Sequence, residues 1–349
     1  MKKHKELWFA LAFVLVAALA VDLTAKGLRP EHRDFGSTWE AYRCEPKNSV
    51  DVLFVGSSYA YCDWNPGVIY GETGLTSYVM AGSEQTPQIT YWYLKEALKT
   101  QTPSAVVMEG TSLFFHQYQA YTQINVGYMP WGLARLGATF TAAEPDKRLG
   151  LLFDLYFYHD RWKEMTLGEF RDRVLARPAA DQLKGFTAVE TVFAETEGGP
   201  FLHPMEQTPA EHADALRAFE GIAGLCREKN IPLIVTVNPT YSQYSQETYD
   251  ALEGELREID GGVTFVNWSG DFEKFGMDPV RHLSDGGHLN RAGAALFSAG
   301  TAAYLEEFGL RPREQTAENA AAWGETVQYW ENWSADWDAK AKETGSPEG

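Results

Sequence analysis

Short apolar runs alternate with segments of helical periodicity along much of the chain. The first run, residues 50–55, has one acidic residue among five apolar ones and stops at Gly56, which predicts a strand buried on both faces. Further strands are predicted at residues 76–80, 105–108, 231–237 and 263–266, and helices at residues 88–99, 211–229, 246–259 and 291–308. Because strand alternates with helix, we expect an α/β fold, a three-layer α/β/α sandwich around a parallel sheet.

The N-terminus departs from this alternation. A basic cluster in residues 1–5 precedes an unbroken apolar run over residues 7–21, an arrangement typical of export. Residues 1–24 are predicted to be an uncleaved transmembrane anchor, since a run extended to Leu23 approaches the roughly 20 apolar residues that span a bilayer. Cleavage after the small-residue pattern at 18–20 is the alternative, and it would give a secreted protein. The lysines before the run favour a cytoplasmic N-terminus, which places a connector at 25–49 and all later residues outside.

Two further stretches lack the strand–helix rhythm. Residues 111–205 are rich in aromatic side chains and are predicted to form an insertion or cap within a main domain at 50–310. The C-terminal tail, residues 311–349, carries four tryptophans, most of them at helical spacing: Trp323, Trp330, Trp333 and Trp337. We expect a terminal helix that docks these rings on the domain, with sugar stacking and contact with a membrane interface as the alternatives.

Composition and charge narrow the range of functions. Hydrophobic residues make up 44% and aromatic residues 13% of the 349 positions, which is the composition of a globular protein. The formal net charge of −18 argues against nucleic acid as a partner, because nucleic-acid binders need basic patches that displace counterions. The three cysteines, Cys44, Cys62 and Cys226, fit no zinc pattern, and no metal site is predicted.

The candidate chemistry lies in two motifs. Gly56-Ser57-Ser58 follows the first predicted strand, at the edge of a parallel sheet where active sites gather, so Ser58 is a candidate nucleophile. Glycine and serine are common in turns without function, and this motif alone is weak. Near the other end, Asp285 precedes His288 in a glycine turn, so its carboxylate can orient the imidazole while the other ring nitrogen faces a serine. Together the two motifs predict a serine-dependent acyl-ester enzyme that needs no cofactor.

These motifs resemble those of the SGNH (GDSL-like) hydrolase family, whose nucleophilic serine follows the first strand and whose Asp-x-x-His motif lies near the end. The resemblance implies a flavodoxin-like α/β/α sandwich, with an oxyanion hole made by the N–H groups of Ser58 and Gly82 and by a third donor. Ser83, the next residue, is the alternative to Gly82. The family's third block, Gly-x-Asn-Asp, falls on residues 110–113, where Ser112 stands in place of the asparagine. Ser112 is therefore the expected third donor, in a reduced role.

The anchor and the Gly-Ser-Ser block make the chain similar to a narrower group, the membrane-anchored SGNH proteins of bacterial envelope biosynthesis. Examples are the D-alanyl-transfer protein of teichoic-acid operons and the alginate O-acetylation proteins. The similarity implies a catalytic domain on the outer face of the cytoplasmic membrane, working beside a membrane-bound O-acyltransferase. The implied reaction is acyl transfer to, or removal from, a cell-envelope glycopolymer. A plain carbohydrate acetylesterase or lipase-like hydrolase acting on small acyl esters is one alternative, and a catalytically silent polysaccharide-binding scaffold is another.

Other residues have a weaker claim to the site. His159 and Arg161, in an aromatic part of the insertion, are candidates for binding an anionic substrate, and Asn238 is a candidate for lining the pocket after the fourth strand. A structural hydrogen-bond network is the competing interpretation for each of the three. His282 is a rival base but lacks an acid at the right offset, and Glu109 is expected to buttress the end of the third strand.

Overall fold

The structure is a computed structural model that describes residues 2–29, 39–153, 155–193 and 201–344. Two units make up the chain: the first comprises residues 1–32 and 144–178, and the second comprises residues 33–143 and 179–349. The predicted insertion at 111–205 is therefore not one body. Its middle part belongs to the first unit and its two flanks belong to the second.

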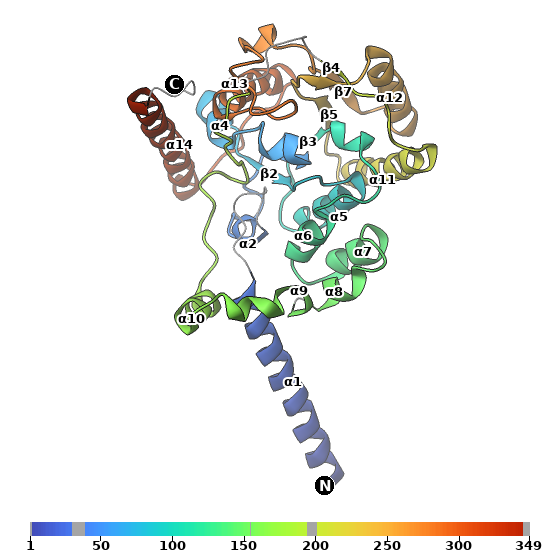
Figure 1. Cartoon of the computed structure of the whole chain (residues 1–349), viewed down its shortest axis with the longest axis vertical. Coiled ribbons are helices and arrows are strands. Elements are labelled where there is room, and N and C mark those ends of the chain that lie inside the picture. The colour runs from blue at the N-terminus through green and yellow to red at the C-terminus, as the bar shows by residue number, and fades with distance from the viewer. Residues whose placement is uncertain (1, 30–38, 154, 194–200, 345–349) are drawn as a thin grey trace. The chain divides into compact units, whose positions relative to one another are not determined.

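A five-stranded parallel sheet forms the centre of the second unit (Figure 1). Its spatial order is β2-β1-β3-β5-β7. The strands run over β1 (Val52–Gly56), β2 (Ser77–Ala81), β3 (Ala105–Glu109), β5 (Leu233–Val237) and β7 (Thr264–Asn267). All five predicted strands are confirmed. The first four are buried along their whole length, which explains why their sequences are continuous apolar runs rather than alternating ones.

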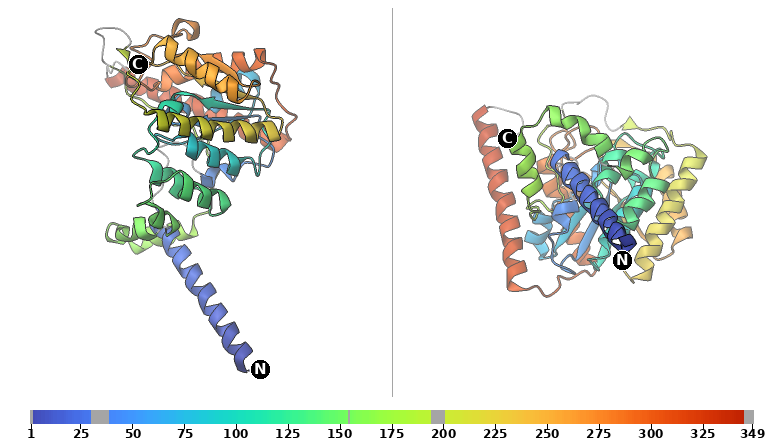
Figure 2. Two further views of the ribbon diagram at one scale, coloured as in Figure 1. Left: turned by 90° about the vertical axis from the view of Figure 1, so that its right-hand side faces the viewer. Right: turned by 90° about the horizontal axis from the view of Figure 1, so that it is seen from below.

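Helices flank this sheet, and the four predicted from periodicity correspond to α5, α11, α12 and α13 (Figure 2). Sequence signals fix several of their ends; α11, for example, begins with a capping box between Thr208 and Glu211. A separate two-stranded parallel pair joins β4 (Phe201–Leu202) to β6 (Ser242–Gln243). The helical elements of this unit are α2 (Trp39–Tyr42), α3 (Ser58–Tyr61), α4 (Pro66–Thr73), α5 (Pro87–Ala97), η1 (Thr111–Phe114), α6 (Thr122–Tyr128), α7 (Leu133–Thr141), α11 (Pro209–Glu228), α12 (Gln246–Ile259), η3 (Glu273–Phe275), α13 (Arg291–Glu307) and α14 (Ala317–Thr344).

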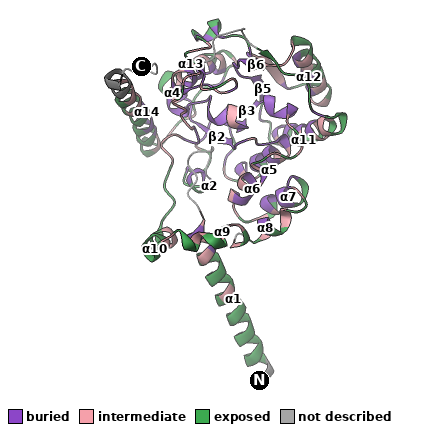
Figure 3. Ribbon diagram, in the orientation of Figure 1, coloured by how far each residue is buried: buried purple, intermediate pink, exposed green. Residues whose placement is uncertain are grey.

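The buried residues of the second unit gather around the sheet, and the C-terminal helix contributes to this core (Figure 3). Trp323 and Trp330 of α14 are buried, and the Trp323 ring stacks on Tyr70 of α4 with centroids 4.9 Å apart. Trp330 meets the ring of Phe186 edge-on. The predicted terminal helix with docked tryptophans is thus confirmed at these two positions, where the buried rings pack on the domain.

The first unit contains α1 (Lys2–Leu28) with α8 (Arg148–Leu152), α9 (Leu155–Tyr158), η2 (His159–Lys163) and α10 (Leu167–Leu175). In α1, the 25 residues His4–Leu28 are long and apolar enough to cross a membrane, and none of their most apolar window is buried inside the protein. A signal sequence has the same properties. The helix continues past residue 24, where the predicted anchor ends, as far as Leu28.

Candidate active site

The nucleophile turn follows β1 directly. Gly56 has a φ of +143°, and a Cβ on it would lie 2.7 Å from the Cβ of Glu109, so only glycine fits this position. Ser57 then caps α3, its hydroxyl oxygen accepting the N–H of Tyr59 at 3.4 Å. As a result, Ser58 is the first residue of α3, at the carboxyl edge of the sheet.

A tight loop before α13 holds Asp285 and His288. The buried residues Leu283 and Leu289 form an antiparallel bridge, and the N–H of Ser284 donates to the carbonyl of His288 at 2.9 Å. Inside the loop, Asp285 Oδ1 accepts the backbone N–H groups of Gly287 and His288 at 2.7 and 2.8 Å. These bonds turn the carboxylate back toward the imidazole three residues later.

The two motifs meet in space. Ser58 Oγ lies 2.7 Å from Nε2 of His288, although the two residues are 230 positions apart in the sequence. On the other side of the ring, Nδ1 of His288 lies 2.9 Å from Oδ2 and 3.0 Å from Oδ1 of Asp285. This is the serine–histidine–aspartate arrangement of a nucleophile, its base and the group that orients the base.

The electrostatics of the pair agree with those roles. Burial acts to raise the pKa of Asp285, but the hydrogen bond and charge of His288, with the N–H groups of the loop, outweigh burial and lower this pKa to about 2. Burial acts to lower the pKa of His288, yet the hydrogen bond and negative charge of Asp285 outweigh it, and the pKa of His288 is raised. Asp285 is therefore ionised at neutral pH and stabilises a proton on His288.

Comparison with models of known protein families finds no match, and comparison with curated proteins finds no significant one. Among the described residues, no group of three or more histidine, cysteine, aspartate or glutamate side chains is placed to hold a metal ion. A hydroxyl, an imidazole and a carboxylate in this order can activate the hydroxyl for attack on an acyl carbon.

Two residues that sequence reasoning missed support His288. The ring of Tyr59, next to the nucleophile, stacks on the imidazole with centroids 4.9 Å apart and planes 21° apart. Asp63 is fully buried, and its Oδ1 accepts the N–H of Leu289 at 3.2 Å. Burial raises the pKa of Asp63 to about 8. The available signal for Asp63 was a single acid in the otherwise apolar stretch 60–64.

Asn238 has a structural role in place of the predicted pocket-lining one. Its side chain is 1% exposed, and its Nδ2 donates to the carbonyl of Tyr59 and to Oδ2 of Asp63, both at 3.0 Å. Its Oδ1 accepts the hydroxyl of Thr236. With these partners, Asn238 connects the end of β5 to the nucleophile helix, as the competing interpretation of a structural hydrogen-bond network predicts.

Glu109 buttresses the nucleophile turn, as expected. The carboxylate is fully buried, accepts the Ser57 hydroxyl at 2.9 Å and accepts the N–H of Thr111. Burial raises its pKa. Glu109 therefore links the ends of β1 and β3 beneath Ser58.

Two of the predicted oxyanion donors, Gly82 and Ser112, have different surroundings in the structure. Gly82 lies directly after β2, and a Cβ there would come within 2.3 Å of Oδ1 of Asn125, so the backbone is closely covered on that side. Ser112 is fully buried in η1, and its hydroxyl donates to the carbonyl of Glu109 at 3.0 Å. Because this local bond occupies the hydroxyl proton, Ser112 closes the turn after β3 and we do not retain it as a donor.

The remaining predicted residues are not part of the triad. His159 and Arg161 belong to the first unit, whereas the triad belongs to the second. His159 is exposed with Nδ1 3.0 Å from the carbonyl of Tyr156, and Arg161 donates to the carbonyl of Leu28. The rival base His282 accepts the N–H of Asp278 on Nδ1 at 2.7 Å, and burial lowers its pKa.

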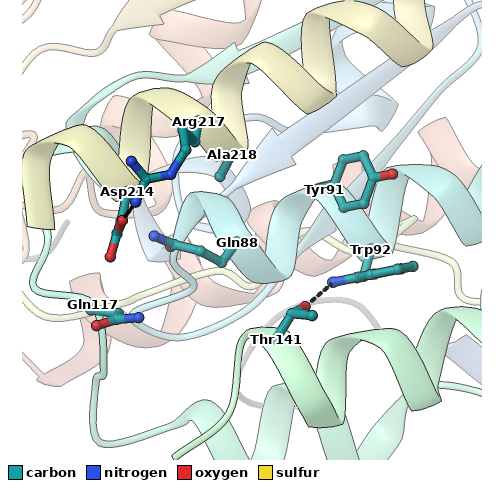
Figure 4. A pocket seen from close by; sticks show the side chains of 8 residues that line it. All are labelled: Gln88, Tyr91, Trp92, Gln117, Thr141, Asp214, Arg217 and Ala218. Atoms are coloured by element: carbon teal, nitrogen blue, oxygen red, sulfur yellow. Dashed lines mark hydrogen bonds and ion pairs between the residues drawn. The ribbon is translucent and has the colours of Figure 1, made fainter.

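A surface depression of about 410 Å³ lies in another part of the second unit (Figure 4). Gln88, Tyr91 and Trp92 of α5 face Asp214 and Arg217 of α11, and Trp92 Nε1 donates to the Thr141 hydroxyl of α7 at 2.8 Å. The other lining residues are Gln117 and Ala218. Ser58, Asp285 and His288 are not among them, so the depression is separate from the triad.

Proposed function

We propose that the chain is an SGNH-type serine acyl-ester enzyme in which Ser58 is the nucleophile, His288 the base and Asp285 the group that orients the base. The observation that carries the proposal is the unbroken line of contacts from Ser58 Oγ through the imidazole to the Asp285 carboxylate. Each half of this line is held by its own local structure, the turn after β1 and the loop before α13. A catalytically silent scaffold would have no reason to retain both motifs in hydrogen-bonding contact.

The topology supports the same family. Numbered in chain order, the strands of the large sheet lie in the order 2-1-3-4-5, which is that of flavodoxin-like doubly wound folds. In such folds helices cover both faces, and ligands bind beyond the carboxyl ends of the strands where the order reverses, here between β1 and β3. Ser58 follows β1 at that edge. We therefore propose a three-layer α/β/α sandwich for the second unit.

In the proposed mechanism, Nε2 of His288 accepts the Ser58 proton as Oγ attacks the acyl carbonyl carbon. Asp285 keeps the other imidazole proton on Nδ1, which leaves Nε2 free to act as a base, and stabilises the imidazolium that forms. His288 then gives the proton to the departing alkoxide oxygen as the ester C–O bond breaks, leaving an acyl ester on Ser58. Next, water or a sugar hydroxyl gives its proton to His288 and attacks the acyl carbon, and His288 returns the proton to Ser58 Oγ as the acyl–Oγ bond breaks.

The backbone N–H groups of Ser58 and Gly82 are the proposed donors to the oxyanion. Ser58 is at the start of α3, where backbone N–H groups have no partner within the helix. With the Ser112 hydroxyl committed to Glu109, the hole has two donors where the family has three. Losing one such donor costs on the order of 10²-fold or more in rate, so a slow enzyme is expected.

The proposed physiological reaction is transfer of an acyl group to a cell-envelope glycopolymer. In this account α1 holds the enzyme on the outer face of a bacterial cytoplasmic membrane, beside a membrane-bound O-acyltransferase that supplies the acyl groups. The length and apolar character of α1 support this location. Tethering raises the effective concentration of donor and acceptor, which a slow enzyme requires if transfer is to outrun hydrolysis.

The full-length protein in lipid nanodiscs tests the proposal with p-nitrophenyl acetate and envelope oligosaccharides. We expect slow release of p-nitrophenol that a suitable oligosaccharide accelerates, with acetyl groups appearing on the sugar by mass spectrometry. Fast hydrolysis to free acetate, unchanged by every glycan, would support the esterase alternative instead. Release no faster than that of a Ser58→Ala variant would support the silent scaffold.

A further inference from the structure

The described residues of 144–178 are fastened to the C-terminal end of α1. Lys26 Nζ donates to the carbonyls of Val174 and Ala176, both at 2.9 Å, and a Cβ on Gly27 would overlap the ring of Phe170. At the next residue, the carbonyl of Leu28 accepts a hydrogen bond from Arg161. The Arg161 bond caps the last carbonyl of α1, and Lys26 of α1 in turn caps carbonyl groups at the C-terminal end of α10, so the contacts join the segment to the helix.

Within the first unit, α9 and α10 lie across the end of α1 rather than along it (Figure 1). The contact at Gly27 comes four residues after Leu23, where the apolar run stops. At 1.5 Å of rise per residue, this contact lies about 6 Å beyond the apolar stretch. The polar headgroup layer on each side of a bilayer is roughly 5–7 Å thick, so a spanning α1 would place the segment at headgroup depth.

The segment also exposes several large apolar side chains close together in the sequence, which is rare on the surface of a soluble protein. Six of them, within 27 positions, are each more than 60% exposed: Leu149, Phe153, Tyr156, Trp162, Leu167 and Leu175. They come from α8 and the residue after it, from α9, from η2 and from α10, so the exposure belongs to the whole segment and not to one loop. Aromatic and leucine side chains of this kind are typical of helices that lie in a membrane interface.

The charge of the segment fits a phospholipid surface. Residues 144–178 carry seven Lys or Arg and seven Asp or Glu, and are thus electrically balanced, whereas the whole chain carries −18. A segment without net charge is not repelled by anionic headgroups. The remaining, strongly acidic part of the chain would be repelled from such a surface.

We propose that residues 144–178 form a collar embedded in the headgroup layer of the bilayer that α1 spans. We name as the collar the described residues of this range, 144–153 and 155–178. The inference rests on the anchor of the proposed function, because a cleaved α1 would leave the collar without its fixed depth. The partner that covers the exposed side chains of the collar is phospholipid, because the collar is joined to the spanning helix at headgroup level.

The collar changes how the second unit is tethered. The chain passes between the two units at three places, after residues 32, 143 and 178. A single anchor helix would give the catalytic unit one connection to the membrane, whereas an embedded collar gives it three. The substrate that this arrangement favours is one presented at the membrane, such as an acyl donor or a growing polymer held by a membrane protein.

Depth-dependent quenching tests the collar in the full-length protein. Single cysteines at Trp162→Cys and Leu167→Cys, in a background with the exposed Cys44→Ser, carry an environment-sensitive fluorophore in liposomes of zwitterionic and anionic phospholipid. Val14→Cys in α1 reports the bilayer core. Gly254→Cys on α12 is the matched control, because a Cβ there has no neighbour within 4 Å and the label does not disturb packing.

We expect the fluorophores at 162 and 167 to be quenched most by lipids that carry a spin label at the headgroup end of the acyl chain. The fluorophore at 14 should be quenched most by lipids that carry the spin label at the far end of the acyl chain. The label at 254 should not be quenched by either. Quenching at 14 without quenching at 162 and 167 would overturn the collar and leave the anchor intact. Absence of quenching at all positions would overturn the anchor itself. Shielding at 162 and 167 that appears only at high protein density would overturn lipid as the occupant in favour of a second copy.

Discussion

Replacing Asp285 by asparagine separates the orienting role of the carboxylate from its role in the loop. The new Oδ1 can still accept the N–H groups of Gly287 and His288, so the turn is expected to keep its shape. The new amide N–H₂, however, faces Nδ1 of His288 where the carboxylate had accepted a proton. Nδ1 is then left with Oδ1 as its acceptor, which two backbone N–H groups already share, and the opposing amide donor favours moving the imidazole proton to Nε2, where the base is lost.

The expected loss can be worked from these contacts. Opposing donors, or the tautomer change that avoids them, cost about 2 kcal/mol. Losing the charge that stabilises the imidazolium adds about 1 kcal/mol, a reduced figure because the Asp285 side chain is 58% exposed and solvent screens it. The total of about 3 kcal/mol corresponds to roughly a hundredfold slower acylation. A fully buried aspartate in this position would be expected to cost about 10⁴-fold.

The assay is the second-order rate of p-nitrophenyl acetate turnover as a function of pH. His288 must be neutral to accept a proton, so the rate rises with pH through the pKa of His288, which lies above its usual value of about 6.5. Because Asp285 raises that pKa, the midpoint should move to lower pH in Asp285→Asn while the plateau falls. Asp278→Asn is the matched control, since Asp278 contacts the other nearby histidine, His282, through its backbone N–H, and its carboxylate accepts the N–H groups of Val280 and Arg281. A plateau within about threefold of wild type in Asp285→Asn, or an equal loss in Asp278→Asn, would refute the assignment.

Two further substitutions test the supports of the site. Gly56→Ala should lower the free energy of unfolding by about 3 kcal/mol or more in chemical denaturation, because φ is +143° and the new Cβ meets that of Glu109. Gly254→Ala, on an exposed helix face, should instead be neutral or slightly stabilising, and equal effects at the two glycines would contradict the packing account. Tyr59→Leu should lower kcat about 2- to 10-fold with little change in KM, since it removes the stacking on the imidazole. Tyr70→Leu, which removes a comparable stack on α14, should leave kcat unchanged; a loss of kcat there as well would mean that both act through stability.

Most of the sheet and the residues of the triad could be predicted from the sequence, because both are marked by patterns of neighbouring residues. Each central strand is buried on both faces and is therefore a continuous apolar run, and the glycines around Ser58 and His288 mark sharp turns. Asn238 shows where such reasoning ends. Its position after a strand placed it at the correct edge of the sheet, but only the folded neighbours, Asp63 and Tyr59, determine that its amide points inward.

The role of the middle segment could not be predicted for a related reason. His159 and Arg161 look like ligand-binding residues when only their type and aromatic neighbours are considered. Their partners are carbonyl groups, and for Arg161 that carbonyl belongs to Leu28, 133 positions earlier in the chain. Periodicity reports which face of a helix is apolar, not which distant element covers it. For the same reason the sequence did not show that residues 144–178 leave the main domain and join α1.

The central claim, that Ser58 is the acylated nucleophile, is tested most directly by fluorophosphonate labelling followed by peptide mapping. Ser57 is the matched control, because it is the adjacent hydroxyl but donates to the buried Glu109 carboxylate, away from His288. We expect a single adduct on Ser58, lost in Ser58→Ala and strongly slowed in His288→Ala, and retained in Ser57→Ala despite a loss of about 1 kcal/mol in stability from the missing cap. Labelling that persists in Ser58→Ala, or that maps to Ser57, would contradict the account.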